Sequence, residues 1–353
     1  MEVGPAWQAV GEATGERAAA AAPPSVHAER LTYLDGWRGL SILAVLLGHF
    51  APLAMFNTGR LGVEMFFVLS GRLMADVLFV ERYPLGAFFR RRIARVWPAL
   101  FVFVAIMAVA FSAPGPLQVR WIDIASCLTF TANYVRINIH NMGVLDHVWS
   151  LCVEEWGYLT LGLVALGVRR WGVNPALAIG ALALACMAKG LVLSGAGLDY
   201  YAVYWRTDVR MASIMMAAAV FLVRRQAPNG TAWPRWTPIA FGAVGLALSV
   251  AIVPDTVKYS LGTLCLCLAM ASLDRAPAGL KRVLADPLLA RLGLWSFSLY
   301  LWQHPFFRLI GKAPIALLLA GVVACALASF YLIEQPARRW LNRRWRAGGG
   351  TAA

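Results

Sequence analysis

The chain has 353 residues, of which 60% are hydrophobic and only 14% are charged. Soluble domains are typically about 45–50% apolar and about 25% charged, so this composition excludes an ordinary soluble protein and predicts an all-α, polytopic membrane protein. The net charge is +14, but much of the arginine stands in short clusters between apolar runs. That pattern is typical of cytoplasmic loops, and no nucleic-acid partner is expected.

The chain divides into two tails and one long apolar region. Residues 1–30 are rich in Ala, Glu and Pro and contain no apolar core of signal-peptide length, so we expect a disordered cytoplasmic tail. Residues 31–340 form the predicted transmembrane domain, and residues 341–353 a basic cytoplasmic tail. About ten transmembrane helices are predicted from apolar runs at 39–56, 61–80, 94–113, 148–168, 175–194, 207–223, 236–253, 257–273, 294–311 and 313–333.

The basic residues of the loops predict the orientation. One alternating set of loops is rich in arginine, and the other set has few basic residues. Because short basic loops stay cytoplasmic, both termini are predicted to be cytoplasmic, as an even number of spans requires. The expected location is the cell inner (cytoplasmic) membrane, as a multi-pass protein in the lipid bilayer. The arginine-rich loops contain Arg90, Arg91, Arg92 and Arg95, Arg169 and Arg170, Arg224 and Arg225, and Arg338 and Arg339.

The first apolar run carries a polar signal. Arg38 and His49 are eleven residues apart, so a continuous helix puts both on one face, about 16 Å apart along its axis. Half of a bilayer core is about 15 Å thick, so an Arg38 at the surface places His49 near the midplane. A hydrogen-bonded packing histidine would also fit there, but polar residues at that depth usually mark a functional site. No other histidine is expected to lie so deep.

The second run contains the segment GVEMFFVLSG at 62–71, with Glu64 and Ser70 as its polar side chains. Arg72 follows directly, and Asp76 is expected to neutralise it through an i, i+4 ion pair. Arg92 and Arg95, after this run, are helical neighbours on one face and share the cytoplasmic side with Arg38. Three guanidinium groups at one surface predict a phosphate clamp, because guanidinium matches phosphate with paired hydrogen bonds. A plain positive-inside cluster or a lipid-headgroup site would explain the same arginines.

The fourth run begins with the segment WSLCVEEWGY at 149–158, after an outward connection whose polar and aromatic residues suit a sugar or an ordinary loop. Ser150, Glu154 and Tyr158 are spaced i, i+4, i+8 and share one stripe of a helix. Adjacent carboxylates in a span are costly without a partner, unless they stay in water at the interface. We expect one of them to orient His49 or exchange a proton with it, and prefer Glu154 to Glu155.

The last two runs contain the segments SFSLYLWQHP at 296–305, with Tyr300, and IEQP at 333–336. In order and spacing, these motifs resemble the acyltransferase-3 family of integral membrane acyltransferases, which includes O-acetyltransferases of bacterial surface polysaccharides and some macrolide acyltransferases. The resemblance runs from about Leu34 to Arg339 and covers every segment quoted above. The sequence departs from the family pattern at Arg72 and at His304, which follows Gln303 rather than Trp302 directly, so a role for His304 is less expected.

The resemblance implies acyl transfer from acyl-coenzyme A, in the first place acetyl-coenzyme A, to a hydroxyl of a carbohydrate or macrolide-like acceptor. It implies a donor site at Arg38, Arg92 and Arg95 and catalysis at His49. No permanently bound cofactor and no metal site is expected, and the six scattered cysteines suggest neither metal nor disulfide. No esterase-like domain follows the spans, so a hand-over outside the membrane would need a separate extracytoplasmic partner protein.

Two mechanisms stay open at the sequence level. His49 either deprotonates the acceptor hydroxyl or carries the acyl group itself. The alternative function is a proton-coupled transporter or flippase of a glycolipid or small molecule. A histidine near the membrane midplane, with basic residues at the membrane surface, also suits a carrier. Transporters often show internal repeats, and none is visible in this sequence. A non-catalytic membrane scaffold would not require the Arg, His and Glu residues in this order.

Overall fold

The computed structural model describes residues 26–227 and 233–347. The first 25 residues of the predicted N-terminal tail and residues 348–353 of the predicted C-terminal tail lie outside the described residues. The first helix already begins at Val26, and the last one continues to Ala347.

Helices make up the fold. Between residues 26 and 347, apart from the gap at 228–232, there are no β-strands and only isolated bridges such as Leu53 with Phe56. The predicted all-α fold is therefore confirmed. The long helices are α1 (Val26–Phe50), α2 (Thr58–Ala75), α3 (Leu85–Ala110), α6 (Trp149–Trp171), α7 (Pro175–Gly195), α9 (Thr207–Gln226), α10 (Thr237–Leu248), α12 (Thr263–Ser272), α14 (Pro287–Phe307), α15 (Ile315–Ser329) and α16 (Gln335–Ala347). The short helices are η1 (Asp76–Val80), α4 (Trp121–Leu128), α5 (Ala132–Asn138), η2 (Gly143–Val148), α8 (Tyr200–Tyr204), α11 (Asp255–Val257), η3 (Lys258–Gly262), η4 (Leu273–Arg275), α13 (Ala278–Leu284) and η5 (Phe330–Glu334).

Five continuous helical segments of the described chain are long and apolar enough to cross a membrane, and they make this a multi-pass membrane protein. Several present large apolar side chains on the outside, as Leu163, Leu177 and Leu317 do, which is the arrangement expected of a surface in contact with lipid. The five segments are Leu85–Ala110, Gly143–Trp171, Pro175–Gly195, Asp255–Arg275 and Ile315–Trp345.

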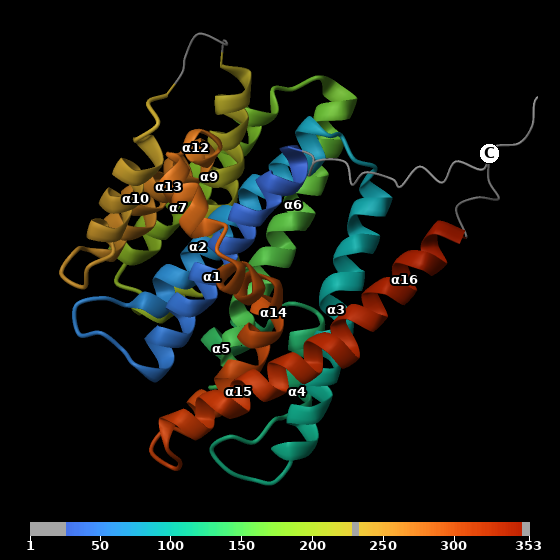
Figure 1. The fold of residues 1–353 in the computed structure, drawn as a ribbon. Helices are drawn as coiled ribbons and strands as arrows, with labels where there is room; N and C mark the ends of the chain where they lie inside the picture. Colours follow the sequence, from blue (N-terminus) through green and yellow to red (C-terminus); the bar gives the residue numbers. More distant parts are fainter. Residues whose placement is uncertain (1–25, 228–232, 348–353) are drawn as a thin grey trace, which may run out of the picture.

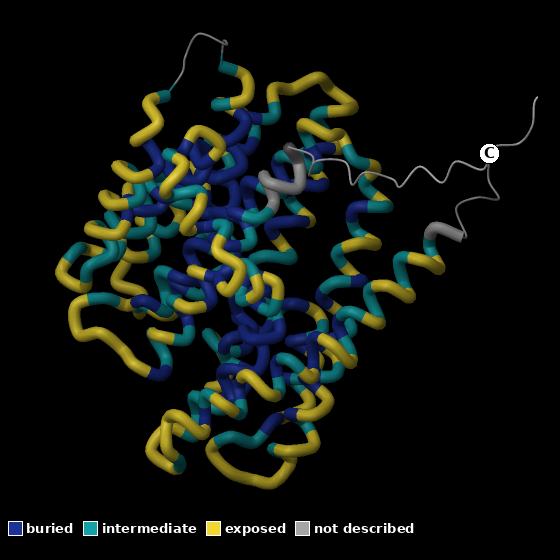
Figure 2. The backbone as a smooth tube through the Cα atoms, in the orientation of Figure 1, coloured by how far each residue is buried: buried dark blue, intermediate teal, exposed yellow. Residues whose placement is uncertain are grey.

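The remaining long helices form the centre of the bundle. Helix α1 packs along both α14 and α2, and α2 packs along α9. Helix α7 covers α9, α10 covers α12, and α16 packs on α3 (Figure 1). Buried residues concentrate in the middle of this arrangement, and exposed ones on its outer helices and connections (Figure 2). The polar motifs of the sequence lie mostly on the central helices and on the inner faces of α3 and α6.

Two glycines allow α1 to approach its neighbours closely. A Cβ atom on Gly293 would lie 1.9 Å from the carbonyl oxygen of Asp35, and one on Gly36 would lie 1.7 Å from the carbonyl oxygen of Leu284. No side chain fits at either position, so the backbones nearly touch, as they do at small-residue contacts between membrane helices. Arg38 lies one turn of α1 beyond this contact, and the crossing fixes its position.

The ion pair expected between Arg72 and Asp76 is not formed, and that prediction is wrong. Arg72 is 1% exposed and donates to Asp274 in η4 across 3.0 Å. Asp76 instead lies 3.8 Å from the guanidinium of Arg225. Both pairs join helices that are far apart in the sequence, because an i, i+4 pair on one helix competes with partners that packing brings closer.

Candidate active site

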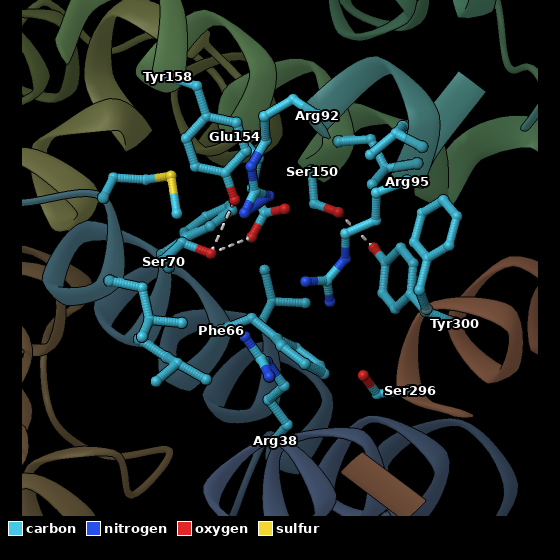
Figure 3. Close-up of a pocket in the computed structure, with 18 residues that line it drawn as sticks. Arg38, Phe66, Ser70, Arg92, Arg95, Ser150, Glu154, Tyr158, Ser296 and Tyr300 are labelled. Carbon is cyan, nitrogen blue, oxygen red and sulfur yellow. Dashed lines mark hydrogen bonds between the residues drawn. The ribbon is translucent and has the colours of Figure 1, made fainter. Parts of the chain in front are cut away.

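A cavity of about 730 Å³ lies among α1, α2, α3, α6 and α14 (Figure 3). These five helices bring polar side chains from distant parts of the sequence to this one space. The predicted site residues that line it are Arg38, Ser70, Arg92, Arg95, Ser150, Glu154, Tyr158 and Tyr300.

The cavity is strongly basic. The guanidinium groups of Arg38, Arg92 and Arg95 point into the same space, from α1 and α3 (Figure 3). Arg95 is close enough to Arg38 and Arg92 to be repelled by the positive charge of each. Arg38 is paired with Asp35 at 2.6 Å, whereas within the described part of the chain Arg92 and Arg95 form no ion pair. Although the Glu154 carboxylate in the same cavity acts electrostatically on Arg92 and Arg95, three guanidinium groups around one space form a site for an anion, and phosphate matches their geometry.

The middle of the cavity contains a chain of hydrogen bonds between α2 and α6. The Tyr158 hydroxyl donates to the Ser70 hydroxyl at 3.0 Å, and Ser70 donates to the Glu154 carboxylate at 2.8 Å. The Arg92 guanidinium lies over the Tyr158 ring, 4.5 Å from its centre. Ser150, Glu154 and Tyr158 all line the cavity, so the stripe predicted from their spacing is confirmed.

The far end is formed by hydroxyl groups. Tyr300 donates to the carbonyl oxygen of His147 at 2.9 Å, and its oxygen lies 2.6 Å from the Ser150 hydroxyl. The Ser150 hydroxyl also lies 3.4 Å from the same carbonyl oxygen, so the two hydroxyl groups share this acceptor and either of them can be the donor to the other. The Tyr300 ring also contacts the His147 imidazole, with centres 5.4 Å apart. This wall therefore has the cavity on one side and histidine side chains on the other.

Three histidines meet behind the wall. The His147 and His304 rings stack with centres 4.8 Å apart, and His49 contacts His304 at 5.8 Å. The expectation that no other histidine lies as deep as His49 is therefore wrong, and His304 has a closer relation to His49 than its sequence offset suggested. His304 Nε2 lies 3.2 Å from the carbonyl oxygen of Gly143. Because a carbonyl only accepts, that nitrogen carries the proton and Nδ1 has a free lone pair.

Buried polar atoms around His49 lack partners. In the described part of the chain, His49 Nδ1, His304 Nδ1 and the side-chain amide of Gln303 have no hydrogen bond of ordinary geometry, and Gln303 lies beside His49. Buried polar atoms in proteins are nearly always satisfied, by water or ligand when not by protein. The region around His49 is thus polar and suited to receiving a polar group.

Three predicted residues lie away from the cavity, and the proposed carboxylate–histidine pairing needs correction. His49 and Glu155 do not line the cavity. Within the described residues neither Glu154 nor Glu155 hydrogen-bonds to His49, because Glu154 is bound to Ser70. Glu64 forms a buried ion pair with Arg210 of α9 and accepts a bond from Thr263 at 2.5 Å. It joins α2, α9 and α12 and is not a part of this site.

His147 is not among the site residues predicted from the sequence, where it falls in the outward connection. In the structure it is 4% exposed and lies against His304 and Tyr300. Its spacing from Ser150 was a usable signal, because residues three apart lie on one helix face. The short helix η2 continues directly into α6 at Trp149, so the pattern of α6 extends back to His147.

Comparison with known proteins places the chain among acyltransferases. The sequence model of the acyltransferase domain family matches residues 31–334. The chain is 25% identical over 348 residues to a peptidoglycan O-acetyltransferase, OatA, of Listeria monocytogenes, covering 87% of this chain and 55% of that protein. It is 24% identical over 360 residues to the O-acetyltransferase OatA of Staphylococcus aureus strain NCTC 8325, covering 87% and 57%. The chain thus spans little more than half the length of these relatives. No solved structure matches it.

Proposed function

Since the chain belongs to the acyltransferase-3 family and is an acyltransferase, we propose that it is a membrane-bound O-acyltransferase. It moves an acyl group, in the first place acetyl, from acyl-coenzyme A to a hydroxyl of a surface carbohydrate or other small acceptor. The names of its relatives support an acetyl group and an oxygen acceptor. The observation that carries the proposal is one cavity lined by three arginines and by hydroxyl groups that have histidines behind them.

The proposed topology has ten spans, with both termini in the cytoplasm. The apolar segments described above supply five of them. Helices α1, α2, α9 and α14 are 18 to 25 residues long and bury charged or polar side chains between them. These side chains lower the mean hydropathy of each helix, but each helix is still long enough to cross a bilayer. The shorter α10 completes the set. The inner membrane is the proposed location because acyl-coenzyme A is a cytoplasmic metabolite.

The donor is proposed to bind with its phosphates at the arginines. Guanidinium groups form strong, often bidentate bonds to phosphate oxygens. Arg38, Arg92 and Arg95 line the same cavity as Ser150 and Tyr300, so a thioester arm bound at the arginines would be within the space that the two hydroxyl groups line. The acyl carbon would then stop at Tyr300, with the three histidines immediately behind it.

His49 is proposed to act at the reacting carbon. In direct transfer, its imidazole takes the proton of the acceptor hydroxyl while the oxygen attacks the thioester carbonyl. A carbon–oxygen bond forms, the carbon–sulfur bond breaks, and the proton passes from the imidazole to the departing thiolate. In the covalent alternative, the imidazole nitrogen attacks the thioester carbonyl first and coenzyme A leaves as its thiolate. The acceptor oxygen then attacks the acyl carbon, the carbon–nitrogen bond breaks, and the proton of the acceptor hydroxyl ends on the thiolate. Both routes need the Tyr300 side chain to move or the acceptor to pass beside it.

The test is acyl transfer by the purified protein in vesicles. Radiolabelled acetyl-coenzyme A is supplied with a panel of carbohydrate and macrolide hydroxyl acceptors, and labelled product is measured with and without protein. Transfer to a hydroxyl of any acceptor supports the proposal. If coenzyme A is never released and the donor does not bind, the donor assignment is wrong. Acceptors that need a soluble extracytoplasmic partner would react only when an extract of the cell surface is added.

A further inference from the structure

A second hollow continues the cavity outward at its basic end. It encloses about 1,070 Å³ of open space between α3 and α16, and Arg92 and Arg95 line both this groove and the inner cavity. Helix α16 packs on α3 and then leaves it toward its C-terminal end (Figure 1). The two hollows therefore adjoin each other at Arg92 and Arg95.

The groove is lined by arginines without counter-charges. Arg90 and Arg91 of α3 and Arg338 of α16 join the two arginines at the junction. Within the described residues none of the five is in an ion pair, and no carboxylate lines the groove. Glu334 is near Arg95 and Arg338, but it is buried and accepts a hydrogen bond from Ser298 at 2.9 Å. Like charges held together repel, so this cluster of arginines favours the binding of an anion.

One face of α16 contributes to the groove. Arg338, Asn342 and Trp345 are spaced i, i+4, i+7 and all line it. Arg343 of the same helix is exposed and does not line the groove. On the opposite wall the Arg91 guanidinium lies over the Tyr83 ring, 4.5 Å from its centre. The groove thus combines several positive charges with two aromatic rings and one amide.

We propose that this groove binds the nucleotide end of the coenzyme A donor, its diphosphate and its phosphorylated adenosine. The inference rests on the proposed function, and it assigns a second part of the donor to residues outside the inner cavity. Arginines suit the phosphates, and aromatic side chains such as Trp345 offer a flat surface on which a purine stacks. Arg92 and Arg95 then stand at the junction, where the nucleotide ends and the arm begins. An anionic lipid headgroup would bind this groove by the same chemistry, through its phosphate.

The test compares two donors that differ only in the nucleotide. Acetyl-coenzyme A carries it, and acetyl-4′-phosphopantetheine lacks it. For the wild-type protein in neutral-lipid vesicles, we expect a KM for the short donor at least about tenfold higher. Arg338→Ala should raise the KM for acetyl-coenzyme A by about tenfold, the effect of losing one charge-assisted bond. It should change the KM for the short donor less than about twofold. Arg343→Ala removes the same charge from the same helix and should leave both KM values unchanged.

Further arms separate the possible occupants. Adenosine 3′,5′-bisphosphate should compete with acetyl-coenzyme A for the wild-type protein and compete less well for Arg338→Ala and Trp345→Leu. Equal KM values for the two donors with the wild-type protein would overturn the groove assignment while leaving the O-acyltransferase function intact. An effect of Arg338→Ala that appears only in vesicles with anionic lipid would assign the groove to a headgroup and also overturn it. No transfer from either donor would instead refute the proposed function.

Discussion

The Ser70 hydroxyl donates a hydrogen bond to the Glu154 carboxylate across 2.8 Å and thereby joins α2 to α6 inside the cavity. Tyr158 donates to the same Ser70 oxygen, and Arg92 lies on the Tyr158 ring. Glu154 is therefore linked through two hydroxyl groups to one of the arginines that we assign to the donor. Arg92 and Arg95 also lie close enough to Glu154 to act electrostatically on its carboxylate. We infer that Glu154 positions the donor end of the cavity rather than the histidine end.

The first prediction concerns this hydrogen-bond chain. Ser70→Ala leaves the Glu154 carboxylate and the Tyr158 hydroxyl without their shared partner. An unsatisfied buried polar group costs about 1–3 kcal/mol, so the variant should unfold at lower temperature and bind acyl-coenzyme A several-fold more weakly. The measurements are thermal unfolding in detergent and the donor KM. Ser112→Ala is the control, because Ser112 is exposed and lies outside the cavity. Unchanged donor KM in Ser70→Ala would show that the chain does not position Arg92.

The second prediction concerns the donor arginines. Arg92→Ala should weaken binding of acyl-coenzyme A by about tenfold or more, because a charge-assisted hydrogen bond is worth roughly 1.5–3 kcal/mol. Arg92→Lys should restore binding only partly, since the planar fork is lost. Calorimetric titration with a non-reactive donor analogue gives the affinity. Arg38→Ala and Arg95→Ala should behave alike, and Arg170→Ala, outside both hollows, is the control. Normal donor affinity in all three Ala variants would refute the clamp.

The third prediction concerns orientation in the membrane. Gly115 and Gly279 are exposed, and a side chain at either position meets no atom within 4 Å, so cysteine fits at both. In a background without the six native cysteines, we expect an impermeant thiol reagent to label Gly115→Cys on intact cells. Gly279→Cys should be labelled only after the membrane is opened. The reverse pattern would invert the topology and would place the donor arginines outside the cell.

Much of the cavity is predictable from the sequence because it depends on local helix geometry. The stripe of Ser150, Glu154 and Tyr158 follows from spacing alone, and so does the shared face of Arg92 and Arg95. Loop charge predicts that Arg92 and Arg95 lie on the same membrane side as Arg38. The sequence places the stripe of α6 near the opposite surface, and only the packing of the helices brings it to the arginines.

Which side chains meet across two different helices is not predictable in this way. His304 meets His49 only because glycines let α1 and α14 pack closely. Glu64 finds Arg210, and Arg72 finds Asp274, about 146 and 202 residues away. Each of these carboxylates and guanidinium groups had nearer candidates along the chain. Which one is chosen depends on how the helices rotate about their axes, and a single sequence does not determine that rotation.

The fourth prediction concerns His304, which we regard as a positioning residue for His49. Its Nε2 is held by the Gly143 carbonyl, and its ring lies between those of His147 and His49. His304→Ala should lower kcat by about tenfold with little change in the donor KM, because the arginines are unaffected. His304→Gln keeps a donor for the Gly143 carbonyl and should recover part of the loss. An equal rise in KM and fall in kcat, or no rescue by Gln, would point to a structural defect instead.

The fifth prediction concerns His49, the residue on which the proposed chemistry depends. His49→Ala should lower turnover by about 10²–10⁴-fold, the contribution expected of a positioned acid or base. Expression, membrane insertion and donor binding should stay close to normal, because the imidazole lies beyond the hydroxyl wall from the arginines. His49→Gln should fail as well, since an amide forms hydrogen bonds but does not accept a proton near neutral pH. The assay is transfer from radiolabelled acetyl-coenzyme A, with donor affinity measured in parallel.

An incubation without acceptor distinguishes the two mechanisms proposed for His49. Incubation with labelled donor and no acceptor, followed by rapid quenching, should leave label on the wild-type chain if His49 carries the acyl group. The label should be absent from His49→Ala and present in His304→Ala, which keeps the nucleophile. Absence of label from the wild-type chain, with normal transfer once the acceptor is added, indicates that His49 acts only as a base. Wild-type turnover in His49→Ala would exclude both routes and place the reacting carbon elsewhere in the cavity.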